Sequence, residues 1–133
     1  MAIHSVEVGG TFYNVAEASA VNQKKLIATI GSRLAYNLGT DPDVQLDNNF
    51  LMGALLGSSE ADFDKIASIV LYKTVKNGGD ELVTIADFQG RITDYYMLVA
   101  EAVSCNLLDF LNWLSAARRP AQSGKTETAT KAT

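Results

Sequence analysis

The chain has 133 residues, a formal net charge of −4, one cysteine and one histidine. A chain of this length fits one domain that buries about two thirds of its unfolded surface. A single cysteine excludes a disulfide framework within the chain, and no apolar run reaches the roughly 18 residues of a membrane span. We expect a cytoplasmic protein that is neither secreted nor inserted in a membrane.

Two short runs of β-forming residues begin the chain, at residues 3–8 and 11–15. Gly9 and Gly10 separate them, and glycine readily adopts the positive φ angles of a two-residue hairpin turn. The N-terminal segment is therefore predicted to be a small β-hairpin.

Apolar residues then recur at helical spacing and predict a first helix over residues 17–36, which ends before Gly39. Its predicted core face consists of Val21, Leu26, Ile27, Ile30 and Leu34.

Two further helices are predicted after an acidic turn around Pro42. The first covers residues 46–56, and the second begins after Ser59, which is spaced to cap it. The predicted core face of the second is Phe63, Ile66, Ile69, Val70 and Val75.

Glycines at 78 and 79 end that element. Leu82 and Val83 are expected to be extended. Thr84 and Asp87 have the spacing of a cap pair that starts a short helix.

The most informative segment is the stretch of residues 93–117, which is predicted to be one continuous terminal helix. Its polar residues occupy one stripe of roughly 140° on a helical wheel, with Asn106 as the one polar outlier. An ordinary surface helix has an apolar stripe of about 100° or slightly more. This helix therefore has apolar surface left over, which favours a protein interface.

The residues predicted to form that interface, for self-association or for binding another protein, lie at the end of this helix. They are Leu107, Phe110, Leu111, Trp113, Leu114, Arg118 and Arg119. The alternative is that the apolar members of this set fill the core of the monomer.

The chain ends in a hydrophilic segment whose charge is opposite to that of the rest. Residues 1–117 carry 7 Lys/Arg and 14 Asp/Glu, whereas residues 118–133 carry 4 and 1. No large apolar residue follows Pro120, so residues 120–133 are predicted to be a flexible tail after a domain of residues 1–119. The acidic domain disfavours nucleic acid as a partner.

No catalytic, cofactor-binding or metal-ligating residue is predicted. His4 is expected to be frayed or solvent-facing at the start of a strand, and Cys105 is expected to be a core residue whose apolar neighbours raise its pKa. Asp41, Asp43 and Asp47 lack the glycine and glutamate that a calcium-binding loop needs. The sequence indicates a non-catalytic, mainly α-helical protein.

This layout resembles the tail assembly chaperones of lambda-like long-tailed double-stranded DNA bacteriophages, the siphophages. The resemblance covers the whole chain. It rests on the hairpin of residues 6–15, the helical body with acidic loops, the aromatic terminal helix from Tyr95 to Leu114, and the hydrophilic tail after Arg119.

The resemblance implies a protein of the bacterial host cytoplasm that binds the tape-measure protein and the major tail protein during tail assembly. Such a protein is absent from the finished virion, and it is typically made both in a short form and in a form extended by programmed ribosomal frameshifting. A permanent structural protein, either a head-tail connector or a tail terminator subunit, remains an alternative. A small enzyme or ligand-binding domain is a third class, for which the sequence offers no convergent polar residues.

Overall fold

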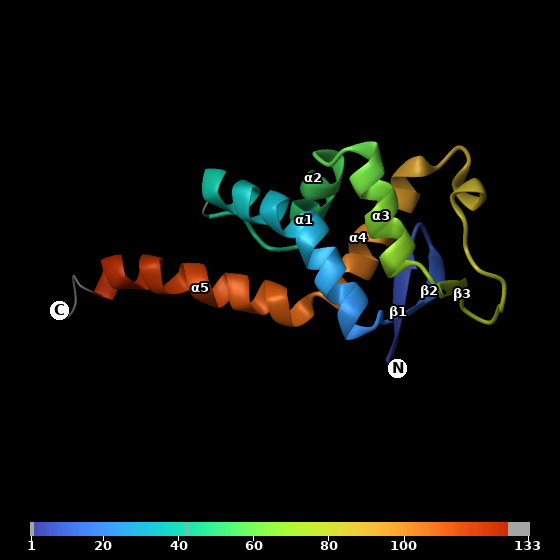
Figure 1. The fold of residues 1–133 in the computed structure, drawn as a ribbon, viewed down its shortest axis with the longest axis horizontal. Helices are drawn as coiled ribbons and strands as arrows, with labels where there is room; N and C mark the ends of the chain where they lie inside the picture. The colour runs from blue at the N-terminus through green and yellow to red at the C-terminus, as the bar shows by residue number, and fades with distance from the viewer. Residues whose placement is uncertain (1, 42, 128–133) are drawn as a thin grey trace.

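A small antiparallel sheet and a group of helices share one hydrophobic core, and one long helix projects from the opposite side (Figure 1). This computed structural model describes residues 2–41 and 43–127, with side chains as far as Ala117. The chain is mainly α-helical, as predicted. Its central element is α4 (Ile92–Asn106). This helix packs against α2 (Asn48–Leu56), α3 (Glu60–Val70) and β1 (Ile3–Val8).

The predicted hairpin is confirmed. Strands β1 (Ile3–Val8) and β2 (Thr11–Ala16) pair in antiparallel fashion. Gly9 and Gly10 form the turn between them with φ angles of +59° and +83°. These angles lie in the left-handed region that glycine tolerates best.

The sheet has a third strand that the sequence did not predict. Strand β3 (Val75–Lys76) pairs with β2, and the Asn77 N–H donates to the Phe12 carbonyl at 2.9 Å. Val75 was predicted to extend the core face of a helix, and that prediction is wrong. A β-branched residue suits a strand, and this strand covers the edge that β2 would otherwise leave unpaired.

Helix α1 (Ala20–Thr40) starts three residues later than predicted and runs through Gly39. Leu26, Ile30 and Leu34 are buried as predicted, but Val21 is 65% exposed and Ile27 is 36% exposed. Val21 and Ile30 are nine positions apart, which at about 100° per residue is roughly two and a half turns and places them on opposite faces of the helix. Val21 therefore faces away from the core.

Helices α2 (Asn48–Leu56) and α3 (Glu60–Val70) both begin at side-chain caps. The Asp47 carboxylate accepts a backbone N–H in the first turn of α2 at 3.1 Å, and the Ser59 hydroxyl does the same for α3 at 3.1 Å. The predicted cap at Ser59 is confirmed, and α2 begins two residues later than predicted.

A short 3₁₀ helix, η1 (Ile85–Phe88), follows an extended stretch. The Asp87 carboxylate accepts the Thr84 N–H at 2.9 Å, as the cap spacing predicts. The Phe88 side chain is fully buried and its ring lies 6.1 Å from that of Tyr13 on β2, which joins this segment to the sheet.

The prediction of one continuous terminal helix is wrong. The chain forms α4 and then α5 (Leu108–Glu127), and these helices meet at Leu107 with a bend of 76°. Among the described helices, none alone is long and apolar enough to cross a membrane. By length and composition alone, the bent pair of α4 and Leu108–Ala117 is long and apolar enough for this when the two helices are taken together.

The bend lies next to the one polar residue that interrupts the apolar face. Asn106 is 4% exposed, and its Oδ1 accepts the backbone N–H of Ala18 at 2.8 Å and the Gln23 amide at 3.3 Å. Its Nδ2 donates to the Ala102 carbonyl at 2.9 Å. The carboxamide therefore fixes the end of α4 to the segment that leads into α1.

The second boundary error concerns the end of the chain. Helix α5 continues through Pro120 to Glu127, so the predicted helix end at Ala117 is wrong. Proline removes one helical N–H, but alanine is the strongest helix former, and Ala116, Ala117 and Ala121 lie close by. The flexibility of residues 120–133 stays a prediction, and residues 128–133 lie outside the described part of the chain.

We predict that Asn106→Leu lowers the free energy of unfolding by about 1–3 kcal/mol, because it leaves the buried Ala18 N–H without an acceptor. Urea denaturation measures this change. Asn112→Leu on the exposed side of α5 is the matched control and should change stability by less than about 0.5 kcal/mol. Equal effects of the two substitutions would show that the Asn106 hydrogen bonds contribute little.

Candidate interaction surface

The bend at Leu107 divides the predicted interface residues between the core and the surface. Leu107, Leu111 and Leu114 are buried, at 1%, 7% and 8% exposure. Phe110 is partly buried against the core, and Trp113 is 61% exposed. The alternative reading, in which these residues fill the monomer core, therefore describes the three leucines but not Trp113.

Phe110 and Trp113 form one aromatic platform on the surface of α5. Their ring centroids lie 6.1 Å apart, with the ring planes inclined by 21°. This separation is within the range of favourable offset stacking. Because Phe110 is held by the core and Trp113 stacks on it, the exposed indole has a fixed neighbour.

The remaining two predicted residues, Arg118 and Arg119, belong to α5. Their side chains fall outside the part of the chain whose side chains are described, so their contact with a partner stays a prediction.

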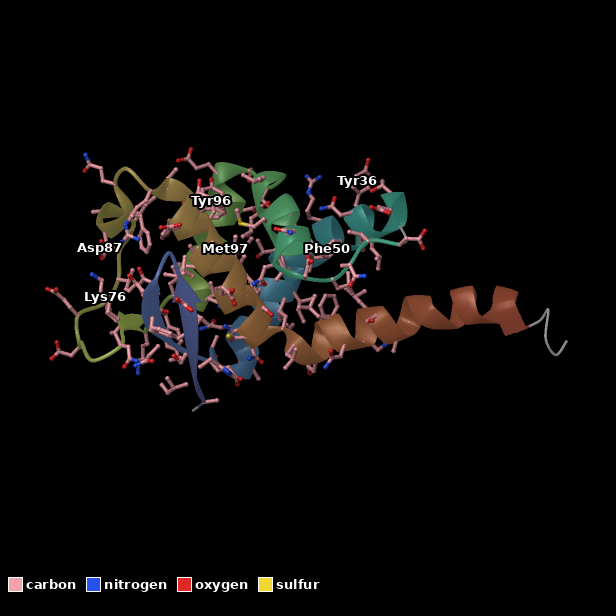
Figure 2. All side chains as sticks on the ribbon, turned by 180° about the vertical axis from the view of Figure 1, so that it is seen from behind. Tyr36, Phe50, Lys76, Asp87, Tyr96 and Met97 are labelled. Atoms are coloured by element: carbon pink, nitrogen blue, oxygen red, sulfur yellow. The ribbon has the colours of Figure 1, made fainter. Side chains whose placement is uncertain are left out.

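Other large apolar side chains are exposed, but they are spread over several elements. Tyr36 projects at the far end of α1, whereas Lys76 and Asp87 mark the opposite end of the molecule (Figure 2). The exposed set outside α5 is Ile3, Phe12, Val21, Ile27, Tyr36, Leu56, Leu82, Ile85 and Ile92. Single exposed apolar residues are normal on protein surfaces.

A small hollow with a mainly polar lining lies beside the bend. It is lined by Glu17, Gln23, Cys105, Asn106, Leu108, Asp109 and Asn112. At Glu17, one carboxylate oxygen lies 2.9 Å from the His4 ring, which is part-buried. His4 was predicted to be frayed or solvent-facing. It lies within β1 with its side chain 36% exposed, so it faces solvent in part, but the Glu17 carboxylate holds it and it is not frayed.

Cys105 lines this hollow and is only partly buried, so it is not the core residue that the sequence predicted. Burial raises the pKa of the Cys105 thiol to about 11, and the nearby Glu101 and Glu17 carboxylates add to the shift. A nucleophilic cysteine needs the opposite environment, with positive charge or a helix N-terminus nearby. The raised pKa of the Cys105 thiol matches the sequence prediction, and negative charge nearby contributes to it as well as burial.

Two other carboxylates near the core, Glu101 and Asp47, have structural partners. The Asn48 amide donates to Glu101 at 2.7 Å, and burial nonetheless raises the pKa of this carboxyl. Of the three aspartates weighed as calcium ligands, Asp47 caps α2. No group of three or more His, Cys, Asp or Glu side chains could hold a metal ion within the residues that were placed.

Comparison with known proteins gave no match to a family model, to a curated protein or to a solved structure.

We predict that Trp113→Asp leaves a folded monomer that is destabilised by about 1 kcal/mol, because only the indole's stacking and partial burial are lost. Leu114→Asp one position later is the matched comparison. It places a carboxylate in the core and should cost about 3–5 kcal/mol. Circular dichroism during thermal unfolding distinguishes them, and unfolding of both variants would assign Trp113 to the core.

We also predict that Cys105 reacts with iodoacetamide at least about tenfold more slowly than an ordinary thiol near pH 8, because a raised pKa leaves little thiolate. The control is the double variant Cys105→Ser with Ala117→Cys, which carries its thiol at an exposed position. The Cys105 rate should keep rising with pH beyond the point where the control levels off. A plateau at the same pH in both proteins would contradict the raised pKa.

Proposed function

We propose that this chain is a non-catalytic tail assembly chaperone of a lambda-like long-tailed bacteriophage. In this proposal it binds the tape-measure protein and the major tail protein during assembly and is absent from the virion. The observation that carries the proposal, together with the resemblance of the sequence, is the aromatic platform of Phe110 and Trp113 on a projecting helix.

The platform suits recognition of another protein better than it suits chemistry. Exposed aromatic residues next to a buried apolar row are typical of helix-in-groove contacts, in which a few anchors carry most of the binding free energy. A helical client such as a tape-measure protein offers the apolar ridges that such a surface binds. The 61% exposure of Trp113 leaves the indole available for this contact.

The polar groups near the platform support a binding role as well. The Asn106 carboxamide oxygen accepts hydrogen bonds from Ala18 and Gln23, and the Glu17 carboxylate contacts the His4 ring. Cys105 has a raised pKa. The Asn106 hydrogen bonds hold the end of α4 in place, so the proposal gives this carboxamide a structural function.

A permanent structural component of the particle, such as a head-tail connector or a tail terminator subunit, is the alternative. It shares the size and the need for protein contacts. The two functions differ in whether the chain remains in finished particles.

The experiment is co-purification of the tagged chain with candidate tape-measure and major tail proteins, together with mass spectrometry of finished particles. Binding to either client and absence from particles is the expected result. Presence in particles at a fixed copy number would replace the chaperone with a structural component. Failure to bind either client and absence from particles would overturn both.

Within that experiment we predict that Trp113→Asp reduces client recovery by at least about tenfold, which corresponds to an anchor worth roughly 1.4 kcal/mol or more. Val21→Asp is the matched control, because Val21 is an exposed apolar residue far from the platform in sequence, at 65% exposure. It should leave recovery unchanged. Equal losses from the two variants would show that the platform has no special role.

A further inference from the structure

We propose that α5 exchanges between two copies of this chain. In the exchanged dimer, α4 and α5 straighten at Leu107 into one continuous helix, and Leu111 and Leu114 of each copy enter the core of the other. This inference rests on the bend itself and does not depend on the proposed function.

The bend is confined to a single residue with nearly helical geometry. Leu107 has φ −117° and ψ 25°, its N–H donates to the Val103 carbonyl at 2.9 Å, and its carbonyl accepts the Leu111 N–H at 2.8 Å. Ideal helical values differ from these by only about 55° in φ and 65° in ψ. Two torsions of one residue therefore interconvert the bent and straight forms.

No residue at the bend prevents a straight helix. Neither glycine nor proline occurs between Ile92 and Ala117. The kinks of natural helices usually have such a cause. Here the cause is tertiary, since α5 turns back to place its leucines in the core.

The buried row runs through the bend without a change of register. Val103, Leu107, Leu111 and Leu114 follow one another at spacings of four, four and three residues, and all four are buried. In a straight helix, this spacing places them on one face. The same sequence therefore supports both the bent and the straight form.

Straightening within one molecule would remove Leu111 and Leu114 from water-excluded sites and leave the core open. A second copy of the chain supplies the matching segment, because its α5 carries the same leucines at the same spacing. Exchange of an identical element restores every contact that straightening removes. The second copy is thus the occupant that fits the vacated site.

The position of α5 makes this exchange local. Beyond its first turns the helix projects away from the other elements (Figure 1), and the Asn106 hydrogen bonds belong to α4 and are kept. The core formed by α1, α2, α3 and the sheet can stay folded while α5 leaves. A short hinge between two such elements is the usual setting for domain exchange.

The test separates monomer and dimer of the full chain by size-exclusion chromatography with light scattering after incubation at high concentration. The labelled variant carries Thr93→Cys and Ala117→Cys in a Cys105→Ser background, with a spin label on each cysteine. It is mixed with excess unlabelled protein, so that the distance measured in each fraction lies within one chain. With the 76° bend the backbone separation is about 29 Å, and in a straight helix it is about 36 Å. We expect the shorter distance in the monomer and the longer one in the dimer.

A second variant tests the hinge without changing the core. Insertion of Gly-Ser-Gly between Leu107 and Leu108 uncouples α5 from α4 and lets α5 dock in its own chain, so dimer formation should fall by at least about tenfold. The same insertion between Gly78 and Gly79, in an exposed loop, is the control and should leave dimer formation unchanged. Circular dichroism of both monomers confirms that they remain folded.

Three results would overturn the exchange. They are the absence of any dimer at high concentration, a dimer that keeps the shorter distance, and a dimer whose population is unaffected by the hinge insertion. The second of these would assign association to the surface of the bent form.

Discussion

The hydrogen bond from the Ala18 N–H to the Asn106 carboxamide is the constraint on which the arrangement of this chain depends. It joins residues 88 positions apart at 2.8 Å inside the core. An amide buried without partners would cost about 1–3 kcal/mol, so the last turn of α4 must lie where Asn106 can meet Ala18. This fixes the end of the central helix against the junction between the sheet and α1.

That constraint determines which apolar residues are available to a partner. With α4 fixed, the chain turns at Leu107, and α5 places Leu111 and Leu114 in the core while Trp113 stays on the surface. Burial of each leucine contributes about 1.5–3 kcal/mol, which is more than the cost of interrupting a helix at one residue. The apolar excess of residues 93–117 is therefore mostly used within the monomer, and the aromatic platform and Leu108 remain at the surface.

Local chemistry explains which features could be predicted from the sequence. The Gly9-Gly10 turn and the Ser59 cap depend on neighbouring residues alone, and both were predicted. The bend depends on the burial of Leu111 and Leu114 in a core that the rest of the chain builds, which no local pattern shows. Asn106, next to the bend, showed only as a polar outlier on an apolar face. Periodicity likewise gave leucines 107, 111 and 114 an apolar face without showing that the bend would bury them and leave Trp113 outside.

The platform differs from the other exposed apolar residues in how its side chains are held. Phe110 packs against the core, and Trp113 stacks on Phe110 at 6.1 Å, so both rings are partly ordered before any partner arrives. Ordering a free side chain at an interface costs about 0.5–1.5 kcal/mol, and a pre-ordered anchor avoids part of that cost. Val21 and Leu56 are exposed aliphatic side chains, and neither stacks on a ring that the core holds among the residues the structure describes. Pre-ordering therefore makes α5 the surface on which a partner gains the most from the same apolar area.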